Sequence, residues 1–188
     1  MDADFDAAVL GQALPPALES ALAEAGAQRS EPVRAMAALM RAQSLAPDHP
    51  AVLIAFYRHH FYGHRLLMAR DVARRALVIG AQALGLPVVW REVPRRALPG
   101  ARHDAATRFF LFVLKGYAYL SLRLDDAVEA RDALALLRAL DPDDCVGAAL
   151  LEAVRQRALS GCGDANGDEP VYVQATGAAA WARLPAVA

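Results

Sequence analysis

The sequence predicts an all-α protein made of stacked helical hairpins, and three observations support this fold class. Apolar residues recur at helical spacing over 105–122 and occupy nearly every side, as is typical of a helix packed between neighbours. A second helical pattern, rich in alanine and leucine, follows at 127–140 and ends before Pro142. Alanine, which favours helix, dominates the 188-residue chain, whose length suits one domain.

Six main helices are expected from the spacing of apolar residues and from the residues that begin and end each segment. In chain order they cover 17–27, 32–45, 51–62, 65–84, 105–122 and 127–140, preceded by a short helix or loose terminus at 2–14. Gly26 is expected to end the first helix, Ser30 to cap the second, and Gly63 to mark the turn after 51–62.

Small residues within helix 105–122 and acidic residues before helix 127–140 indicate how these two helices pack and begin. Gly116 and Ala118 are small, so a second helix can approach helix 105–122 closely there. Asp125 and Asp126 can each accept hydrogen bonds from the free N–H groups at the start of helix 127–140. Their role in capping accounts for this acidic pair without a catalytic function.

Two segments repeat one pattern, AMAALMRAQSLAP (35–47) and ARDALALLRALDP (130–142). Both place leucine four residues after the first alanine and again two residues before the proline, and each is followed by Asp and a new apolar helix. Ala69, Ala73 and Ala76 repeat the small residues without the proline. The pattern resembles the tetratricopeptide repeat (TPR) family, in which small residues lie where helices cross and a proline follows the second helix.

The TPR resemblance covers roughly residues 30–158 and implies a right-handed stack of about three helical pairs. It departs from the family pattern by about two extra residues before Pro142 and by the lack of an early Trp in the first helix. The expected organisation is N-terminal helices (1–29), a TPR-like helical domain (30–159), and a Gly/Asp-rich loop with an extended C-terminal arm (160–188).

An irregular insertion at 85–101, GLPVVWREVPRRALPGA, interrupts the helical pattern with three prolines and two glycines. It is too apolar for a flexible linker, and an irregular segment of this length usually packs on the domain or serves a function. Trp90 is the expected anchor. Either Trp90 covers an edge of the core, or Trp90, Arg91, Arg95 and Arg96 form part of a binding face.

The segment after residue 160 changes character. SGCGDANGDEP is expected to be loop, and the spacing of Asp164, Asn166, Asp168 and Glu169 does not fit an EF-hand calcium loop. Residues 171–173 are interpreted as a short strand or an arm docked on the core, and residues 176–184 as a last turn of helix carrying Trp181.

Charge is distributed unevenly along the chain. Residues 1–57 carry a net charge of −4, residues 58–115 a net charge of +8, and residues 116–188 a net charge of −5. The basic middle segment either serves an acidic partner or pairs with the acidic ends of its own chain.

Several classes of protein are disfavoured by the sequence. No run of 18 apolar residues occurs, and the acidic MDADFDAAVL is unlike a signal peptide, so a cytoplasmic protein without a membrane span is expected. Cys145 and Cys162 are too few for a disulfide framework and are interpreted as buried or incidental thiols. Five arginines over 58–75 lie near tyrosines, but the intervening Asp71 and the negative total charge disfavour a nucleic acid partner.

The histidines are the main candidates for chemistry. His60 and His64 are four residues apart, but no Glu completes an H-E-x-x-H motif and Gly63 interrupts the helix between them. Packing of histidine against aromatic rings is the preferred interpretation. No P-loop, G-x-S-x-G, G-x-G-x-x-G or C-x-x-C motif is present, so we expect no enzyme activity, metal or cofactor.

By the TPR resemblance, the first helix of each pair lines a groove that holds a protein or peptide, here one that is acidic or C-terminal. This implies a non-catalytic adaptor or co-chaperone whose groove draws on helices 51–62 and 105–122. Candidate partner-binding residues there are Tyr57, Arg58, Tyr62, Lys115, Tyr119 and Arg123, with Trp90, Arg91, Arg95 and Arg96 at the rim.

Two alternatives remain open: a homodimeric structural protein whose own tail (171–181) fills the groove, and a small-molecule or metal enzyme. The stretches YRHHFYGHRL, GLPVVWREV and KGYAYLSLRL are similar to small TPR proteins encoded near nitrogen-fixation genes in proteobacteria. That resemblance implies an accessory role in nitrogen fixation.

Overall fold

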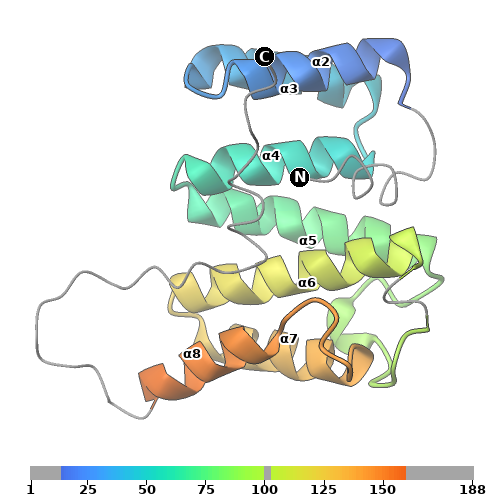
Figure 1. Cartoon of the computed structure of the whole chain (residues 1–188), viewed down its shortest axis with the longest axis vertical. Coiled ribbons are helices and arrows are strands. Elements are labelled where there is room, and N and C mark those ends of the chain that lie inside the picture. The colour runs from blue at the N-terminus through green and yellow to red at the C-terminus, as the bar shows by residue number, and fades with distance from the viewer. Residues whose placement is uncertain (1–13, 100–102, 160–188) are drawn as a thin grey trace, which may run out of the picture.

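The computed structural model of the chain describes residues 14–99 and 103–159. Within these ranges the regular structure consists of seven α-helices and one 3₁₀ turn, with no β-strand, which confirms the all-α prediction. Figure 1 shows the helices stacked in chain order, from α2 and α3 at one end to α7 and α8 at the other. The expected helix at 2–14, strand at 171–173, helix at 176–184 and C-terminal arm lie outside the described residues, apart from Leu14.

Three consecutive helix pairs and a final helix form the stack. The pairs are α2 (Pro16–Ala27) with α3 (Pro32–Leu45), α4 (Pro50–Tyr62) with α5 (Leu66–Ala83), and α6 (Ala105–Arg123) with α7 (Ala127–Leu140), followed by α8 (Ala149–Leu159). Each of the six main predicted helices agrees with the structure to within one residue at both ends. The predicted domain boundary at 29/30 falls in the turn between α2 and α3, which pack against each other as a hairpin.

The spacing of the first two hairpins is regular. Pro16 and Pro50, which begin α2 and α4, are 34 residues apart, and so are Pro32 and Leu66, which begin α3 and α5. Short turns of four and three residues connect the helices within these hairpins, so the paired helices run antiparallel. The insertion breaks this spacing before α6.

Two expected helix ends differ in the structure. Ser30 does not cap α3, because the chain is still turning there: the Glu31 N–H bonds to the Gln28 carbonyl, and Glu31 takes the N-cap position without a side-chain capping bond. Gly26 does not end α2, which continues through Ala27 to a cap at Gln28.

The other turn predictions are confirmed, and one cap was missed. Gly63 caps the C-terminus of α4, and the following His64 adopts a left-handed φ of 55°. Asp126 caps α7 by accepting a 3.4 Å hydrogen bond from the Glu129 N–H. The sequence analysis did not identify Asp104, whose side chain accepts a 2.7 Å hydrogen bond from the Thr107 N–H and caps α6.

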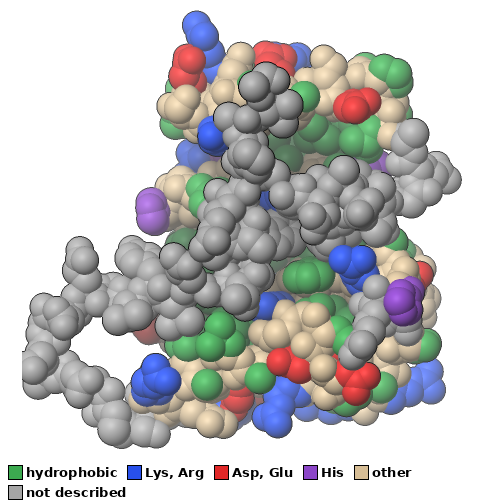
Figure 2. Space-filling view, in the orientation of Figure 1, with side chains coloured by type: hydrophobic (Ala, Val, Ile, Leu, Met, Phe, Trp, Pro, Cys, Tyr) green, Lys and Arg blue, Asp and Glu red, His purple; other side chains and the backbone are tan. Residues whose placement is uncertain are grey.

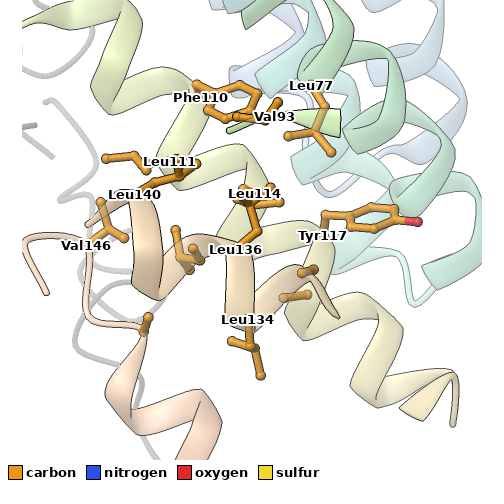
Figure 3. Packing of buried hydrophobic residues seen from close by; sticks show 14 of the residues in the cluster. Leu77, Val93, Phe110, Leu111, Leu114, Tyr117, Leu134, Leu136, Leu140 and Val146 are labelled. Atoms are coloured by element: carbon orange, nitrogen blue, oxygen red, sulfur yellow. The ribbon is translucent and has the colours of Figure 1, made fainter. Parts of the chain in front are cut away.

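Helix α6 lies at the centre of the largest hydrophobic cluster. Phe110, Leu111, Leu114 and Tyr117 are fully buried there and meet apolar residues of α5, the insertion and α7, as Figure 3 shows. A helix buried on this many sides must lie between neighbours. The prediction drawn from its apolar pattern is therefore confirmed.

The insertion is irregular, with a single 3₁₀ turn, η1 (Trp90–Glu92). It is tied to the helices at two further points. Val93 is only 2% exposed in the main core, and the Leu98 N–H donates a 2.9 Å hydrogen bond to the Leu140 carbonyl at the end of α7. The insertion thus packs on the domain as expected.

Arginines of the basic middle segment pair with acids from both ends of the chain. Arg75 lies 2.9 Å from Asp48, Arg70 lies 3.0 Å from Asp126, and Arg91 bonds to Glu129. These contacts support the interpretation that the middle segment matches the charges of its own neighbours. Among the described helices, none combines the length and apolar character needed to cross a membrane.

Candidate functional site

A line of aromatic rings joins α4 to α6. The rings of Tyr57 and Phe61, four residues apart on α4, are stacked with centroids 5.8 Å apart, and the Phe61 ring lies 5.9 Å from that of Tyr119 on α6. We call the surface formed by Tyr57, Arg58, Phe61, Tyr62, Lys115, Tyr119 and Arg123 the α4–α6 face. On the side of the molecule shown in Figure 2, apolar side chains gather beside basic ones at the level of α5 and α6.

Gly116 on α6 faces the end of the Tyr57 side chain of α4. A Cβ atom on Gly116 would lie 3.0 Å from the Tyr57 hydroxyl oxygen, so a larger residue here would require that side chain to shift by a few tenths of an ångström. The neighbour of Gly116 is the end of a long side chain, so the expected close approach of a second helix at this residue stays a prediction. Burial raises the pKa of Tyr57 well above its usual range, and the nearby Tyr119 and Tyr62 add to this effect, so Tyr57 stays neutral.

Cations lie among these rings. The Arg123 guanidinium stands 5.9 Å from the centre of the Tyr119 ring and donates a 2.9 Å hydrogen bond to its hydroxyl. The Lys115 ammonium donates to the Val146 carbonyl, and burial lowers its pKa although Asp144 acts in the opposite direction. Arg58 shares the face of Phe61 and Tyr62 by helical spacing. The face therefore combines aromatic area with positive charge.

Tyr62 forms the exposed edge of this surface. Its side chain is 52% exposed, and its ring contacts Phe61 edge-on at 5.4 Å. A half-exposed tyrosine with an apolar body and a polar tip is a common anchor in protein interfaces. Tyr62 can therefore contact a bound partner without first moving out of the core.

The histidines beside this face pack as the sequence suggested. His60 is 6% exposed and its ring lies 6.2 Å from that of Phe56, while His59 meets His60 at 5.6 Å. Burial, together with the charge of Arg65, lowers the pKa of both groups. Within residues 14–99 and 103–159, no three side chains of His, Cys, Asp or Glu gather as metal ligands. Cys145 is exposed rather than buried.

Trp90 and Arg91 lie on a different side of α6 from the aromatic line. The Trp90 ring packs 5.9 Å from Tyr117 against the core, which confirms that it covers a core edge, and the Arg91 guanidinium lies 4.4 Å from the Trp90 ring centre. Tyr117 and Tyr119 are two positions apart and so point about 200° apart around the helix. The structure therefore does not bring Trp90 and Arg91 together with Tyr119.

Arg95 and Arg96 are exposed on the insertion. Arg96 borders a hollow of about 450 Å³, and apolar side chains supply most of its lining: Leu84, Leu86, Pro94, Ala97, Leu98 and Pro99. Thr107, the other polar residue there, already bonds through its hydroxyl to the Pro99 carbonyl at 3.4 Å. This hollow is bordered by no residue of the α4–α6 face.

The sequence analysis missed a polar cluster that ties the insertion to three helices. Glu129 on α7 accepts hydrogen bonds from Arg91 and from the buried Tyr117, whose oxygen also accepts a 3.3 Å bond from Arg74 on α5. Burial acts to raise the pKa of Glu129, but the bonds from Arg91 and Tyr117 outweigh it and lower the pKa. Spacing within one helix gives no signal for contacts between four separate segments.

The helical stack and its aromatic, cationic face define a protein of the all-α class built from stacked hairpins. The chain is 37% identical over 150 residues to a protein of Azotobacter chroococcum mcd 1 described as an uncharacterized 19.8 kDa protein in the nifW 5′ region. The match covers 79% of this chain and 84% of that protein, and the chain belongs to its family. No protein-family model matches the chain, and no solved structure matches it.

Proposed function

We propose that this protein is a non-catalytic interaction module of the TPR type, with a right-handed stack whose α4–α6 face holds an acidic protein or peptide. The observation that carries the proposal is the aromatic line from Tyr57 through Phe61 to Tyr119, set among Arg58, Lys115 and Arg123. Aromatic and arginine side chains are the residues that most often dominate binding energy at interfaces.

Two further features support this proposal. The 34-residue spacing of the first two hairpins equals the length of a TPR unit, and the small residues Ala69, Ala73 and Ala76 are buried on α5 as in closely packed repeats. Neither α4 nor α6 contains an Asp or Glu, so no acid on these two helices competes with an acidic partner.

We also propose an accessory role in nitrogen fixation. The relative in Azotobacter chroococcum is named for its position in the nifW 5′ region, and neighbouring bacterial genes often serve one process. An adaptor or co-chaperone that binds another protein of that process agrees with a stack of helices that presents a binding face.

Photo-crosslinking in a nitrogen-fixing bacterium tests the proposal. A benzoylphenylalanine residue in place of Tyr62, which is half exposed at the edge of the face, should capture the partner for identification by mass spectrometry. The purified partner is then titrated against the wild-type chain and an Arg58→Glu/Arg123→Glu variant. We expect the variant to lose at least about tenfold in affinity, the equivalent of one charged contact.

A matched control carries the same change in charge elsewhere. Arg34 on α3 and Arg131 on α7 are exposed and pair with Glu31 and Asp132, so Arg34→Glu/Arg131→Glu should bind the partner as the wild type does. Circular dichroism and thermal unfolding establish that both variants fold. Equal affinity of both variants for the partner would refute the proposed face.

A further inference from the structure

The two helices of the α4–α6 face are basic although the chain as a whole is slightly acidic. α4 carries Arg58 beside His59 and His60, and α6 carries Arg108, Lys115 and Arg123, whereas neither helix contains an acid. Such a surface favours a negatively charged occupant that also offers apolar or aromatic groups to the rings.

The chain itself contains a segment with this chemistry after α8. Residues 160–188 carry Asp164, Asp168 and Glu169 against the single arginine Arg183. The order DEPVYV at 168–173 places the two adjacent acids before Pro170 and then two valines that flank Tyr172. The acids of this segment can pair with the cations of the α4–α6 face, and its apolar and aromatic side chains can pack against the aromatic rings there.

Chain length allows this segment to reach the face. The Lys115 ammonium bonds to the Val146 carbonyl, three residues before α8 begins at Ala149, so the start of α8 lies beside the face. α8 has 11 residues and is about 16 Å long. The nine residues at 160–168 extend up to about 30 Å, which is enough to return along α8 to Lys115.

We propose that residues 164–173 of this chain dock on the α4–α6 face and compete there with the partner. Asp168 and Glu169 pair with cations of the face, and Tyr172 packs against its aromatic rings. This inference rests on the proposed function, because it assigns an internal competitor to the same surface. The protein then binds its partner only when the segment is displaced.

A paramagnetic label tests the contact in the full-length chain. With Cys145 changed to serine, Cys162 is the one remaining cysteine and carries a nitroxide six residues before Asp168. In the isotope-enriched chain we expect broadening of the Lys115 and Tyr119 amide signals, while Leu39 on α3 stays sharp. The Asp168→Lys/Glu169→Lys variant should remove the broadening.

The control reverses two charges in the other acidic terminal segment. Asp4→Lys/Asp6→Lys changes the net charge equally and should leave the broadening in place. Three results would overturn the inference: broadening that survives Asp168→Lys/Glu169→Lys, broadening that the control removes as well, and broadening that arises between separate labelled and enriched chains. The last result would assign the contact to a second copy.

A peptide titration tests the competition. The probe is a fluorescein-labelled synthetic peptide with the sequence of residues 164–173. We expect it to bind the full-length Asp168→Lys/Glu169→Lys chain about three to ten times more tightly than the wild type, since two surface charge contacts no longer compete. Equal affinity for both chains would count against an internal competitor.

The two proposals can fail separately. If the partner captured at Tyr62 binds and is sensitive to Arg58→Glu/Arg123→Glu, but the label shows no contact, the internal competitor is excluded and the proposed function stands. If the label shows the contact but no partner is captured, the face serves the chain itself and the proposed function fails.

Discussion

Substituting Gly80 with alanine tests how closely the second and third hairpins pack. It is buried in α5, and a Cβ atom there would lie 3.2 Å from Phe110 Cδ2 and 3.3 Å from Phe109 Cδ1 on α6. Gly26 in α2 has no atom within 4 Å of the same position. The same glycine-to-alanine substitution therefore places a methyl group in a packed core at Gly80 and in open space at Gly26.

The expected energies follow from this difference. Alanine gains up to about 1 kcal/mol over glycine in a helix, whereas overpacking a core costs roughly 1–3 kcal/mol. Gly26→Ala should stabilise the protein by about 0.5–1 kcal/mol. Gly80→Ala should leave its stability unchanged or lower it by up to about 2 kcal/mol, since the clash offsets the helical gain.

Chemical denaturation and thermal unfolding followed by circular dichroism measure the difference. For a domain of this size, 1 kcal/mol corresponds to a shift of about 2–4 °C in Tm. Adding Phe109→Leu to Gly80→Ala should recover part of the loss, because the two residues share one contact. If Gly80→Ala gained as much stability as Gly26→Ala, the close approach of α5 and α6 at this residue would be wrong.

Three other perturbations have defined outcomes. Because burial and Arg65 lower the pKa of His60 below its ordinary 6.5, the stability from this group is fully present above pH 6.5 and falls below it, by at most about 1.4 kcal/mol per pH unit. His60→Phe should reduce the slope of urea midpoints measured from pH 7.5 to 5.5, while His59, whose pKa is also lowered, keeps part of it; an unchanged slope would contradict this. Glu129→Gln weakens the bonds from Arg91 and Tyr117, so we expect a loss of about 1–3 kcal/mol in stability and a change in the fluorescence emission of Trp90. Unchanged stability and emission would show that this cluster does not hold the insertion on the helices. Asp126→Ala removes the α7 cap and the partner of Arg70, so we expect the free energy of unfolding from denaturant titration to fall by about 1–2 kcal/mol. Asp125→Gly should cost no stability, because Asp125 has a left-handed φ of 57° that glycine adopts freely.

Six of the seven residues of the α4–α6 face could be predicted from the sequence. The expected residues on the two helices were Tyr57, Arg58, Tyr62, Lys115, Tyr119 and Arg123, and with Phe61 they make up the α4–α6 face. The TPR resemblance supplied that expectation, because it assigns the groove to the first helix of each pair. Phe61 was missed as a site residue, although its ring makes the direct contact between α4 and α6.

The position of the insertion could not be predicted in the same way. The sequence left open whether Trp90 covers a core edge or joins Arg91 at the rim of the groove; the structure packs Trp90 against Tyr117 and Arg91 against Glu129. Nothing in an irregular segment with three prolines indicates which side of a neighbouring helix it will cover, because no periodic pattern relates its side chains to that helix.

The amino-acid sequence alone determined the helices and most of their ends, because both depend on nearby residues. Apolar spacing, abundant alanine, Gly63 and Asp126 act within a turn or two of the backbone. Only the tertiary structure decided which surfaces meet: Phe61 with Tyr119, and Leu98 with Leu140. Those contacts join residues more than forty positions apart, and their geometry follows from how whole helices pack, which no local pattern specifies.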